Sequence, residues 1–314
     1  MVYVGIDLGG TSIKAGLVDE QGKILCKATC PTLVERGARP VVDDMAKLSL
    51  EVIEKGGYTL DDVKAIGIGL PGIQDPRTGI VPFCTNLYWH EVPVIEWMQE
   101  TINKPIYIGN DATVAGLAES VAGVSAGIEN SVFLTLGTGV GGGIVLGGKV
   151  YSGTNGVGSE LGHMITVIDG ELCTCGNRGC WERYASATAI IRMGREVAEK
   201  NPSCGIAKAV GGDLSKITAK TVIDLAKAGD PDAAQVFDQY VYYLCVGLIS
   251  IINMIDPEMI VLGGGVSGAG EFLLTAVRKK MEELVFYKSM DYARIELAVL
   301  GNDAGIIGAA MLGK

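Results

Sequence analysis

The sequence lacks an excess of basic residues. Its 314 residues carry a net charge of -10, with 26 Lys and Arg against 36 Asp and Glu. An acidic chain does not offer the basic surface that displaces counterions from nucleic-acid phosphates, so general nucleic-acid binding is excluded as an expected function. A small phosphate ligand remains compatible with this charge, because a local group of backbone amides can hold it.

A targeting segment and a membrane-length apolar run are also missing. Residues 1–7 have no basic start and no long apolar region, so we expect no secretory signal. The longest apolar run, 241–255, contains Asn253 and is shorter than the roughly 20 residues that a bilayer-spanning helix needs. We interpret it as a buried core helix. Eight cysteines without a secretory signal favour a reducing compartment, so we expect a cytoplasmic protein without a membrane partner.

Apolar runs typical of strands alternate with helical patterns along the chain. Strand-like runs at 2–7, 13–18 and 23–30 are joined by short turns, which predicts an antiparallel meander. The other expected strands are 63–70, 106–108, 131–136, 141–146, 149–151, 259–262 and 295–299. The expected helices are 40–55, 89–102, 112–122, 185–200, 221–228, 232–255, 271–284 and a last one after Asp303. This order predicts an α/β fold with mixed sheets.

Two glycine-rich turns have related sequences and equivalent places in two meanders. Gly9-Gly10-Thr11 follows the first strand, and Gly137-Thr138-Gly139 follows the strand at 131–136. The match indicates an internal duplication, and we expect two such domains to face each other across a cleft. Amides and hydroxyls of such turns can hold phosphate oxygens, with Lys14 adding charge and Asp7 a magnesium-facing carboxylate. A plain hairpin turn is the alternative.

Three cysteines and a histidine lie close together in the sequence. Cys173-Thr174-Cys175 is followed by Cys180, and His163 lies upstream. A Cys₃His set is a common tetrahedral site for structural zinc. Three buried free thiols beside an ordinary histidine are the alternative, because a C-x-C start departs from the usual finger spacing. Glu160 and Glu182 flank the set, which would hold both carboxylates at a binding pocket.

Three further segments offer polar groups or bare backbone to a ligand. Gly109-Asn110-Asp111 ends a short strand before a helix, so Asn110 or Asp111 suits a helix cap, and Asp111 could instead face a ligand. Asn86 lies in a loop and offers an amide. Gly263-Gly264-Gly265 follows a buried strand, where glycines permit a close approach of a ligand or make a tight turn.

Taken in order, these motifs resemble those of the ROK family of sugar kinases and repressors. The matching segments are Asp7-Leu8-Gly9-Gly10-Thr11, Gly109-Asn110-Asp111, Gly137-Thr138-Gly139, Glu160-x-Gly162-His163, Cys173-x-Cys175-Gly176-x-x-Gly179-Cys180-x-Glu182 and Gly263-Gly264-Gly265. The segments most similar to bacterial ATP-dependent glucokinases are Gly69-Leu70-Pro71-Gly72, Asn86-Leu87-x-Trp89 and Glu182-x-x-Ala185-Ser186-Ala187. The resemblance spans essentially the whole chain, and the cysteine motif is its most specific part.

The resemblance implies an actin-like ATPase (ribonuclease H-like) fold, with two duplicated α/β domains around a cleft. It implies a smaller N-terminal domain at 1–115 plus 300–314 and a larger, zinc-bearing domain at 116–299. The implied reaction is ATP-dependent phosphorylation of glucose at its 6-hydroxyl, with ATP, Mg²⁺ and a structural Zn²⁺, in a homodimer or homotetramer. A kinase for an N-acylhexosamine (N-acetylmannosamine or N-acetylglucosamine) or another hexose is the alternative. A sugar-sensing repressor is disfavoured, because the sequence starts directly with its first strand and is acidic.

The same resemblance implies roles for individual residues. Asp111 is the expected general base. The expected sugar-binding residues are Gly72, Asn86, Asn110, Asp111, Glu160, His163 and Glu182. ATP and magnesium are expected at Asp7, Gly9, Gly10, Thr11, Lys14, Gly137, Thr138, Gly139, Gly263, Gly264 and Gly265. The expected zinc ligands are His163, Cys173, Cys175 and Cys180, with the second ring nitrogen of His163 donating to a sugar hydroxyl.

Overall fold

The computed structural model describes residues 1–314, and the chain divides into two compact units. The first unit comprises Met1–Phe133, Gly143–Ser159 and Val299–Lys314, and the second comprises Leu134–Gly142 and Glu160–Ala298. This division by compactness places the C-terminal segment with the N-terminal residues. The functional domain boundaries expected from the family resemblance, 1–115 plus 300–314 and 116–299, stay a prediction.

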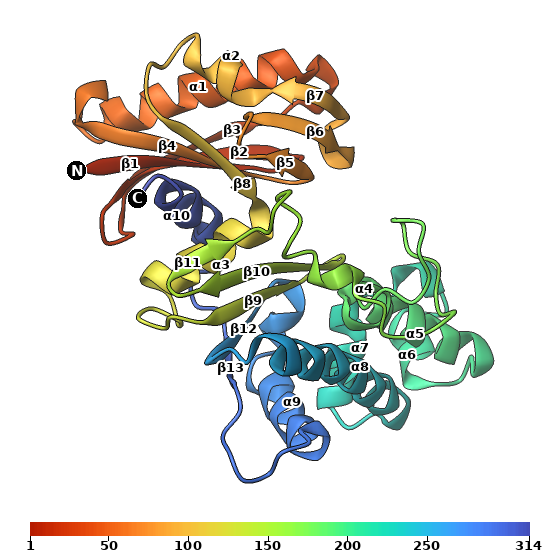
Figure 1. The fold of residues 1–314 in the computed structure, drawn as a ribbon. Helices are drawn as coiled ribbons and strands as arrows, with labels where there is room; N and C mark the ends of the chain where they lie inside the picture. The colour runs from red at the N-terminus through yellow and green to blue at the C-terminus, as the bar shows by residue number, and fades with distance from the viewer. The chain divides into compact units, whose positions relative to one another are not determined.

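The first unit is built on a five-stranded mixed sheet. Its strands are β1 (Val2–Leu8), β2 (Ser12–Asp19), β3 (Ile24–Pro31), β4 (Val63–Leu70) and β8 (Ile106–Asn110), in the order β3-β2-β1-β4-β8. The first three strands pair antiparallel, as the meander predicts, whereas β4 runs parallel to both β1 and β8. Figure 1 shows α1 (Ala38–Lys55) and α2 (Val94–Gln99) on one face of this sheet and α10 (Ala304–Met311) on the other. Helices on both faces explain why β1 is an almost uninterrupted apolar run.

Glycines bring the C-terminal helix α10 into close contact with the sheet. A Cβ atom on Gly5 of β1 would lie 1.9 Å from the Ile306 carbonyl oxygen, and one on Gly67 of β4 would lie 1.7 Å from that of Ala309. Any other residue at either position would push α10 away from the sheet. The same helix packs against α3 (Asp111–Ala122), so the segment that follows the second unit is firmly seated in the first.

A small antiparallel sheet in the first unit was not expected from the sequence. It comprises β5 (Ile73–Asp75), β6 (Ile80–Cys84) and β7 (Trp89–Pro93). The helix predicted at 89–102 is therefore wrong in its first turn, and only Val94–Gln99 is helical. The apolar spacing of this segment suited a helix, but β7 pairs with β6 in the register Val81 to Val92. Pairing with a strand distant in sequence overrode the local pattern.

The second five-stranded sheet repeats the strand order of the first. Its strands are β9 (Ser131–Leu136), β10 (Val140–Leu146), β11 (Lys149–Tyr151), β12 (Met259–Gly263) and β13 (Arg294–Leu297), in the order β11-β10-β9-β12-β13. In both sheets a meander contributes the first three strands and the next two strands follow on the same side. This correspondence is the arrangement that an internal duplication produces.

Helices make up much of the second unit. They are α4 (Glu182–Ala185), α5 (Ala187–Lys200), α6 (Gly205–Ala209), α7 (Ala219–Lys227), α8 (Pro231–Ile255) and α9 (Glu271–Leu284). The single helix predicted at 185–200 is interrupted at Ser186, whose hydroxyl caps α5 by accepting from the Ala189 amide at 3.2 Å. Helix α8 is long and apolar enough to cross a membrane by length and composition. However, it buries residues such as Leu244 and Leu248 and packs against α5, α7 and α9, as a core helix does.

Candidate active site and metal centre

In the first unit, several predicted site residues lie at the carboxyl ends of neighbouring parallel strands. The turns that follow β1, β4 and β8 leave the sheet at the same edge, where α/β sheets commonly bind ligands. Asn110 Nδ2 donates to the Gly72 carbonyl oxygen at 3.5 Å. A Cβ atom on Gly10 would lie 3.7 Å from the Asn86 carbonyl oxygen. The structure therefore brings Gly10, Gly72, Asn86 and Asn110 to one edge of the sheet.

Asn110 and Asp111 have different roles at the start of α3. Asn110 is the N-cap, because its Oδ1 accepts from the amides of Ala112 at 2.9 Å and Thr113 at 3.3 Å. Asp111 is the first helical residue and is exposed, and its Oδ1 accepts from the Ala112 amide at 2.7 Å. Its carboxylate lies at the N-terminal, positive end of the helix dipole of α3. Burial raises the pKa of nearby Cys84, and the Asp111 charge raises it further.

Asp7 and Lys14 form an ion pair beside the first glycine turn. The two residues are opposite each other in the β1–β2 register, and Lys14 Nζ lies 3.2 Å from Asp7 Oδ2. Asp7 also contacts the start of α10, since a Cβ atom on Gly305 would lie 2.6 Å from Asp7 Cγ. The pair places one carboxylate and one ammonium group next to Gly9-Gly10-Thr11, where the exposed Thr11 adds a hydroxyl.

Neither backbone conformation nor local packing requires glycine at three of the predicted phosphate positions. Gly9, Gly10 and Gly137 have φ angles outside the left-handed region that favours glycine. A Cβ atom on Gly137 would meet nothing within 4 Å, and one on Gly9 would meet only the Ser12 carbonyl oxygen at 3.4 Å. The Cα atoms of these turns are therefore not needed for the packing around them. The amides of Gly9 and Gly137 donate within their own turns, to the carbonyl oxygens of Ser12 and Gly139, each at 3.0 Å.

In the second unit, the start of α5 holds the glycine turn that follows β9. The Ala187 amide donates to the Gly137 carbonyl oxygen at 2.8 Å, and the Thr188 hydroxyl donates to that of Thr138 at 2.7 Å. Gly264, with a φ of 82°, lies against the end of β9, because a Cβ atom there would be 2.6 Å from the Leu136 nitrogen. The structure thus places the end of β12, at the buried Gly263, and the turn that follows it, with the exposed Gly265, beside Gly137–Gly139.

Two glycines shape the loop that carries the three cysteines. Ile165 and Cys180 form an isolated antiparallel bridge that closes the loop. Gly176 and Gly179 have φ angles of 92° and 81°, which side chains other than glycine adopt with strain. The chain can therefore reverse direction between Cys175 and Cys180.

A buried tryptophan attaches this loop to α8. Trp181 Nε1 donates to the Tyr243 carbonyl oxygen at 2.8 Å. A Cβ atom on Gly247 would lie 2.0 Å from Trp181 Cε2, so Gly247 makes the space that the indole fills. The cysteine loop is consequently fixed to the longest helix of its unit.

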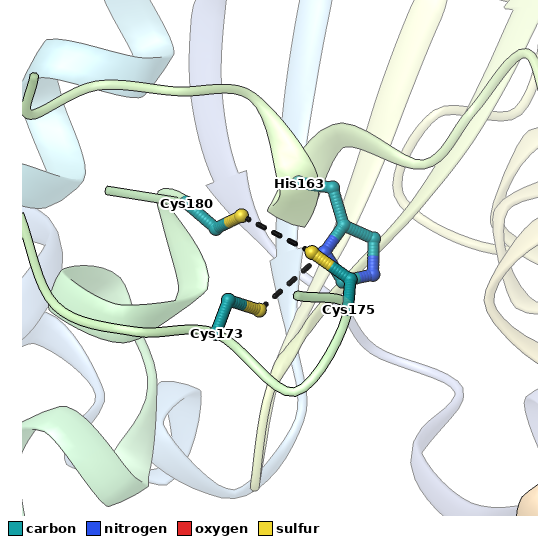
Figure 2. A group of neighbouring side chains, drawn as sticks. All are labelled: His163, Cys173, Cys175 and Cys180. Carbon is teal, nitrogen blue, oxygen red and sulfur yellow. Dashed lines mark hydrogen bonds between the residues drawn. The ribbon is translucent and has the colours of Figure 1, made fainter. Parts of the chain in front are cut away.

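Figure 2 shows the side chains of His163, Cys173, Cys175 and Cys180 gathered around a common centre. Their ligand atoms all lie within 4.8 Å of one another. Cys175 Sγ is 3.6 Å from Cys180 Sγ, and Cys173 Sγ is 3.8 Å from His163 Nδ1. A tetrahedral zinc ion with Zn–S bonds of about 2.3 Å sets its sulfur ligands roughly 3.8 Å apart. The four residues therefore fit a Cys₃His metal centre, with Nδ1 as the histidine ligand atom.

The protonation of the thiols differs between the three cysteines. Burial, together with hydrogen bonds that the Cys180 thiol donates to Cys175 and Cys173, raises the pKa of Cys180 to about 12. Burial also raises the pKa of Cys173, whereas the backbone amide of Asn177 holds the pKa of Cys175 below its usual value. Metal ligation requires thiolates, so a cation at this site has to displace protons from the two buried thiols.

Two carboxylates flank the cysteine cluster on different sides. Glu182 Oε1 accepts a hydrogen bond from Cys173 Sγ at 3.0 Å, and a Cβ atom on Gly139 would lie 2.3 Å from Glu182 Oε2. Glu160 Oε2 lies 3.9 Å from Nε2 of His163, the ring nitrogen that does not face the cysteines. Within the second unit, the structure thus brings Glu160, His163 and Glu182 together and sets Glu182 against the glycine turn.

A model of the ROK family matches residues 3–314. The chain belongs to the ROK family. A glucokinase of Thermotoga maritima is 39% identical over 312 residues, covering 99% of this chain and 96% of that protein. A ROK family glucokinase from Streptomyces griseus, solved in complex with glucose and AMPPNP, is 35% identical with a TM-score of 0.81, covering 99% of each chain. A ROK hexokinase from Thermus thermophilus is 33% identical with a TM-score of 0.85, covering 99% of this chain and 97% of that one.

These solved ROK structures confirm the predicted fold class, the actin-like α/β fold of sugar kinases. Sequence reasoning missed two residues near the predicted site. Gly305 lies against Asp7, and Thr188 holds the carbonyl oxygen of Thr138. Both contacts join segments that are far apart in sequence, and neither residue belongs to a motif. The contact of Gly305 with Asp7 depends on α10 packing against β1, which no local pattern of the sequence shows.

Proposed function

We propose that the chain phosphorylates glucose at its 6-hydroxyl with ATP. The observation that carries this proposal is the exposed Asp111 carboxylate at the end of β8, in a ROK chain that matches glucokinases over nearly its whole length. Asn110 makes the helix cap, so Asp111 is not needed for that purpose. Asp111 accepts the proton of the 6-hydroxyl as that oxygen attacks the γ-phosphorus. Phosphoryl transfer depends mainly on alignment and on neutralising charge, and a positioned base completes it.

The sugar is bound by amides and carboxylates, which suit a ring of hydroxyl groups. Asn86, Asn110 and the backbone at Gly72 supply these groups in the first unit. Glu160, His163 and Glu182 supply them in the second. Because Nδ1 of His163 faces the cysteine sulfurs, Nε2 is the nitrogen that donates to a sugar hydroxyl. Glu160, close to that nitrogen, accepts from a hydroxyl of the same sugar.

The nucleotide is bound by the two glycine turns. Amides of Gly10, Thr11, Thr138 and Gly139 donate to phosphate oxygens, while those of Gly9 and Gly137 hold the shape of their turns. The open space beside the Cα atom of Gly137 supports this role. Lys14 adds positive charge, and Asp7 faces the magnesium ion that accompanies ATP. When bound, Mg²⁺ neutralises charge on the phosphates. The backbone at Gly263–Gly265 passes close to the adenosine.

Zinc is the proposed occupant of the Cys₃His cluster. The atom spacings and the donor set support it. The ligands hold the loop that carries Glu182 and fix the tautomer of His163, so the metal centre shapes the sugar-binding groups without contacting phosphate. Bound zinc supplies structural stability.

A kinase for an N-acylhexosamine, or for another hexose, would use the same residues and differ in the space at the second carbon of the sugar. The deciding experiment measures ATP consumption by the purified chain with glucose, mannose, N-acetylmannosamine and N-acetylglucosamine. We expect glucose to give the highest kcat/KM. A higher kcat/KM with an N-acetylated sugar would indicate an N-acylhexosamine kinase. If no sugar supports ATP consumption, the sugar-sensing repressor would be the remaining function.

We also propose a cytoplasmic location and a homodimer or homotetramer. The eight free cysteines, three of them grouped for metal ligation, suit a reducing compartment. Light scattering coupled to size-exclusion chromatography measures the assembly directly. A mass of a single chain at working concentration would contradict the proposed oligomer.

A further inference from the structure

Helix α3 contacts every point at which the chain leaves or re-enters the first unit. As compactness divides the chain, it passes between the two units at four points, whose first-unit residues are Phe133 in β9, Gly143 in β10, Ser159 and Val299. Each of these four residues touches α3, whose first residue is Asp111. The contacts are of two kinds: close backbone packing and buried hydrogen bonds.

The packing contacts use a glycine of α3. A Cβ atom on Gly116 would lie 3.0 Å from Phe133 Cβ and 3.4 Å from the Cα atom of Gly143. A Cβ atom on Gly143 would in turn lie 2.8 Å from the Ala112 carbonyl oxygen. The backbone of α3 is therefore close to β9 where the chain leaves the first unit and close to β10 where it re-enters. Because the backbones are packed this closely, β9 and β10 cannot shift relative to α3 without a loss of packing energy.

The third crossing is fixed by a buried pair of hydroxyls. Thr113 Oγ1 and Ser159 Oγ lie 3.1 Å apart, and both residues are at least nine-tenths buried. Thr113 is two residues after Asp111, and Ser159 immediately precedes Glu160. One hydrogen bond thus joins the segment that carries the proposed base to the segment that carries a proposed sugar ligand.

The fourth crossing is held by a fully buried carboxylate. Glu119 Oε1 accepts from the amides of Val299 and Leu300, each at 3.0 Å, and Oε2 accepts from the Val124 amide at 2.9 Å. Glycine at position 123 leaves space for this side chain, because a Cβ atom there would lie 1.9 Å from Glu119 Oε2. Charge-assisted hydrogen bonds to backbone amides are strong in a buried setting. Glu119 therefore fixes the returning chain to the last turn of α3.

We propose that α3 is the anchor of all four crossings and that Thr113 and Glu119 are positioning residues for phosphoryl transfer. They act through Asp111, whose helix they tie to the crossing segments, and they do not touch the substrates. This inference rests on the proposed function. It explains why a carboxylate and a hydroxyl pair are buried on a helix that otherwise buries apolar residues and glycine.

The test compares Thr113→Val, which removes the hydroxyl, with Thr113→Ser, which keeps it, and with Glu119→Gln. Ser49→Ala is the matched control, because Ser49 is a buried helical hydroxyl that bonds only within α1, to Met45. Misplacing reacting groups by about 1 Å lowers turnover roughly 100-fold, so we expect kcat of Thr113→Val and Glu119→Gln to fall about 10- to 100-fold. The KM for glucose should change far less. Thr113→Ser should restore kcat, and Ser49→Ala should keep it.

Amide hydrogen exchange tests the anchor independently of activity. In Glu119→Gln the amides of Val299 and Leu300 should exchange faster, and in Thr113→Val those around Ser159 should do so, while α9 stays unchanged. Unchanged exchange at both crossings would overturn the anchor. If the two variants exchange faster but have the same kcat as Ser49→Ala, Thr113 and Glu119 have a structural role only, and the proposed positioning role is refuted. If Glu119→Gln does not fold, the comparison of Thr113→Val with Thr113→Ser decides the question. A wild-type chain without kinase activity would refute the proposed function and not the anchor.

Discussion

Cys173 Sγ lies 3.0 Å from Glu182 Oε1, so a proposed zinc ligand is in direct contact with a proposed sugar ligand. Glu182 also lies against Gly139, at the turn proposed to bind phosphate. Disturbing the cysteine cluster should therefore change sugar binding as well as stability. This coupling distinguishes a metal centre that shapes a site from one that only holds a distant loop.

Removing one cluster thiol tests the zinc proposal. Cys175 is exposed, so Cys175→Ala removes little packing and mainly one ligand. We expect the wild-type chain to carry about one zinc ion and the variant to lose it, with a lower melting temperature and a raised KM for glucose. Elemental analysis, thermal unfolding and kinetics measure the three effects. Cys30→Ala, outside the cluster, is the control and should keep the metal. A zinc-free wild-type chain with full stability and activity would refute the metal centre.

The dependence of stability on pH should differ with and without zinc. The pKa of Cys180 is raised from 9.0 to about 12 in the folded chain. Between pH 9.0 and about 12 the thiol stays protonated in the folded chain but ionises in the unfolded chain. The free energy of unfolding therefore falls as the pH rises through this range. The zinc-stripped chain should therefore lose stability in this range through Cys180. In the zinc-loaded chain Cys180 is already a thiolate, so this loss should be absent. The melting temperatures of both forms, measured over this pH range, check the prediction. An equal change of the melting temperature in the zinc-loaded and zinc-stripped chains would contradict the assignment.

A side chain on a glycine turn should interfere with nucleotide binding. Gly137 is the best position, because a Cβ atom there meets no atom of the chain within 4 Å. Gly139 is less suitable, since a side chain there would also displace Glu182. We expect Gly137→Val to weaken ATP binding at least about tenfold, or 1.4 kcal/mol, while glucose binding is kept. Isothermal titration with each ligand measures both affinities. Normal ATP binding by this variant would place the phosphates elsewhere.

Sequence reasoning was most successful where local pattern and long-range structure agree. The meanders, the glycine turns and α9 at Glu271–Leu284 follow directly from strand alternation, helical spacing and turn residues. The Cys₃His cluster could be predicted because only a few residue types, at short spacings along the chain, form a metal site. The structure does bring the four ligand atoms together. The sequence left open whether Asn110 or Asp111 caps α3, and the hydrogen bonds of Asn110 decide it.

Features that depend on contacts between distant residues could not be predicted. The apolar spacing of Trp89 and Val92 suited a helix, but pairing with β6 makes this segment a strand. Glu119 gave no signal, because an acidic residue within a helix is normally solvated and its partners lie 180 residues away along the chain. The tight packing of α10 depends on Gly5 and Gly67, whose meaning appears only when the helix is in place. Such contacts are set by tertiary packing.

The most direct test of the central claim, that Asp111 is the base of a glucose kinase, is the turnover of Asp111→Asn. The variant keeps the size of the side chain, and the cap of α3 belongs to Asn110, so folding, zinc content and the binding of glucose and ATP should be retained. Asp230→Asn, at the cap of α8, is the matched control and should turn over normally. We predict that kcat of Asp111→Asn falls about 10²- to 10⁴-fold, the usual effect of losing a general base. Near-normal turnover in the folded variant would contradict the account and make Glu160 the next residue to test.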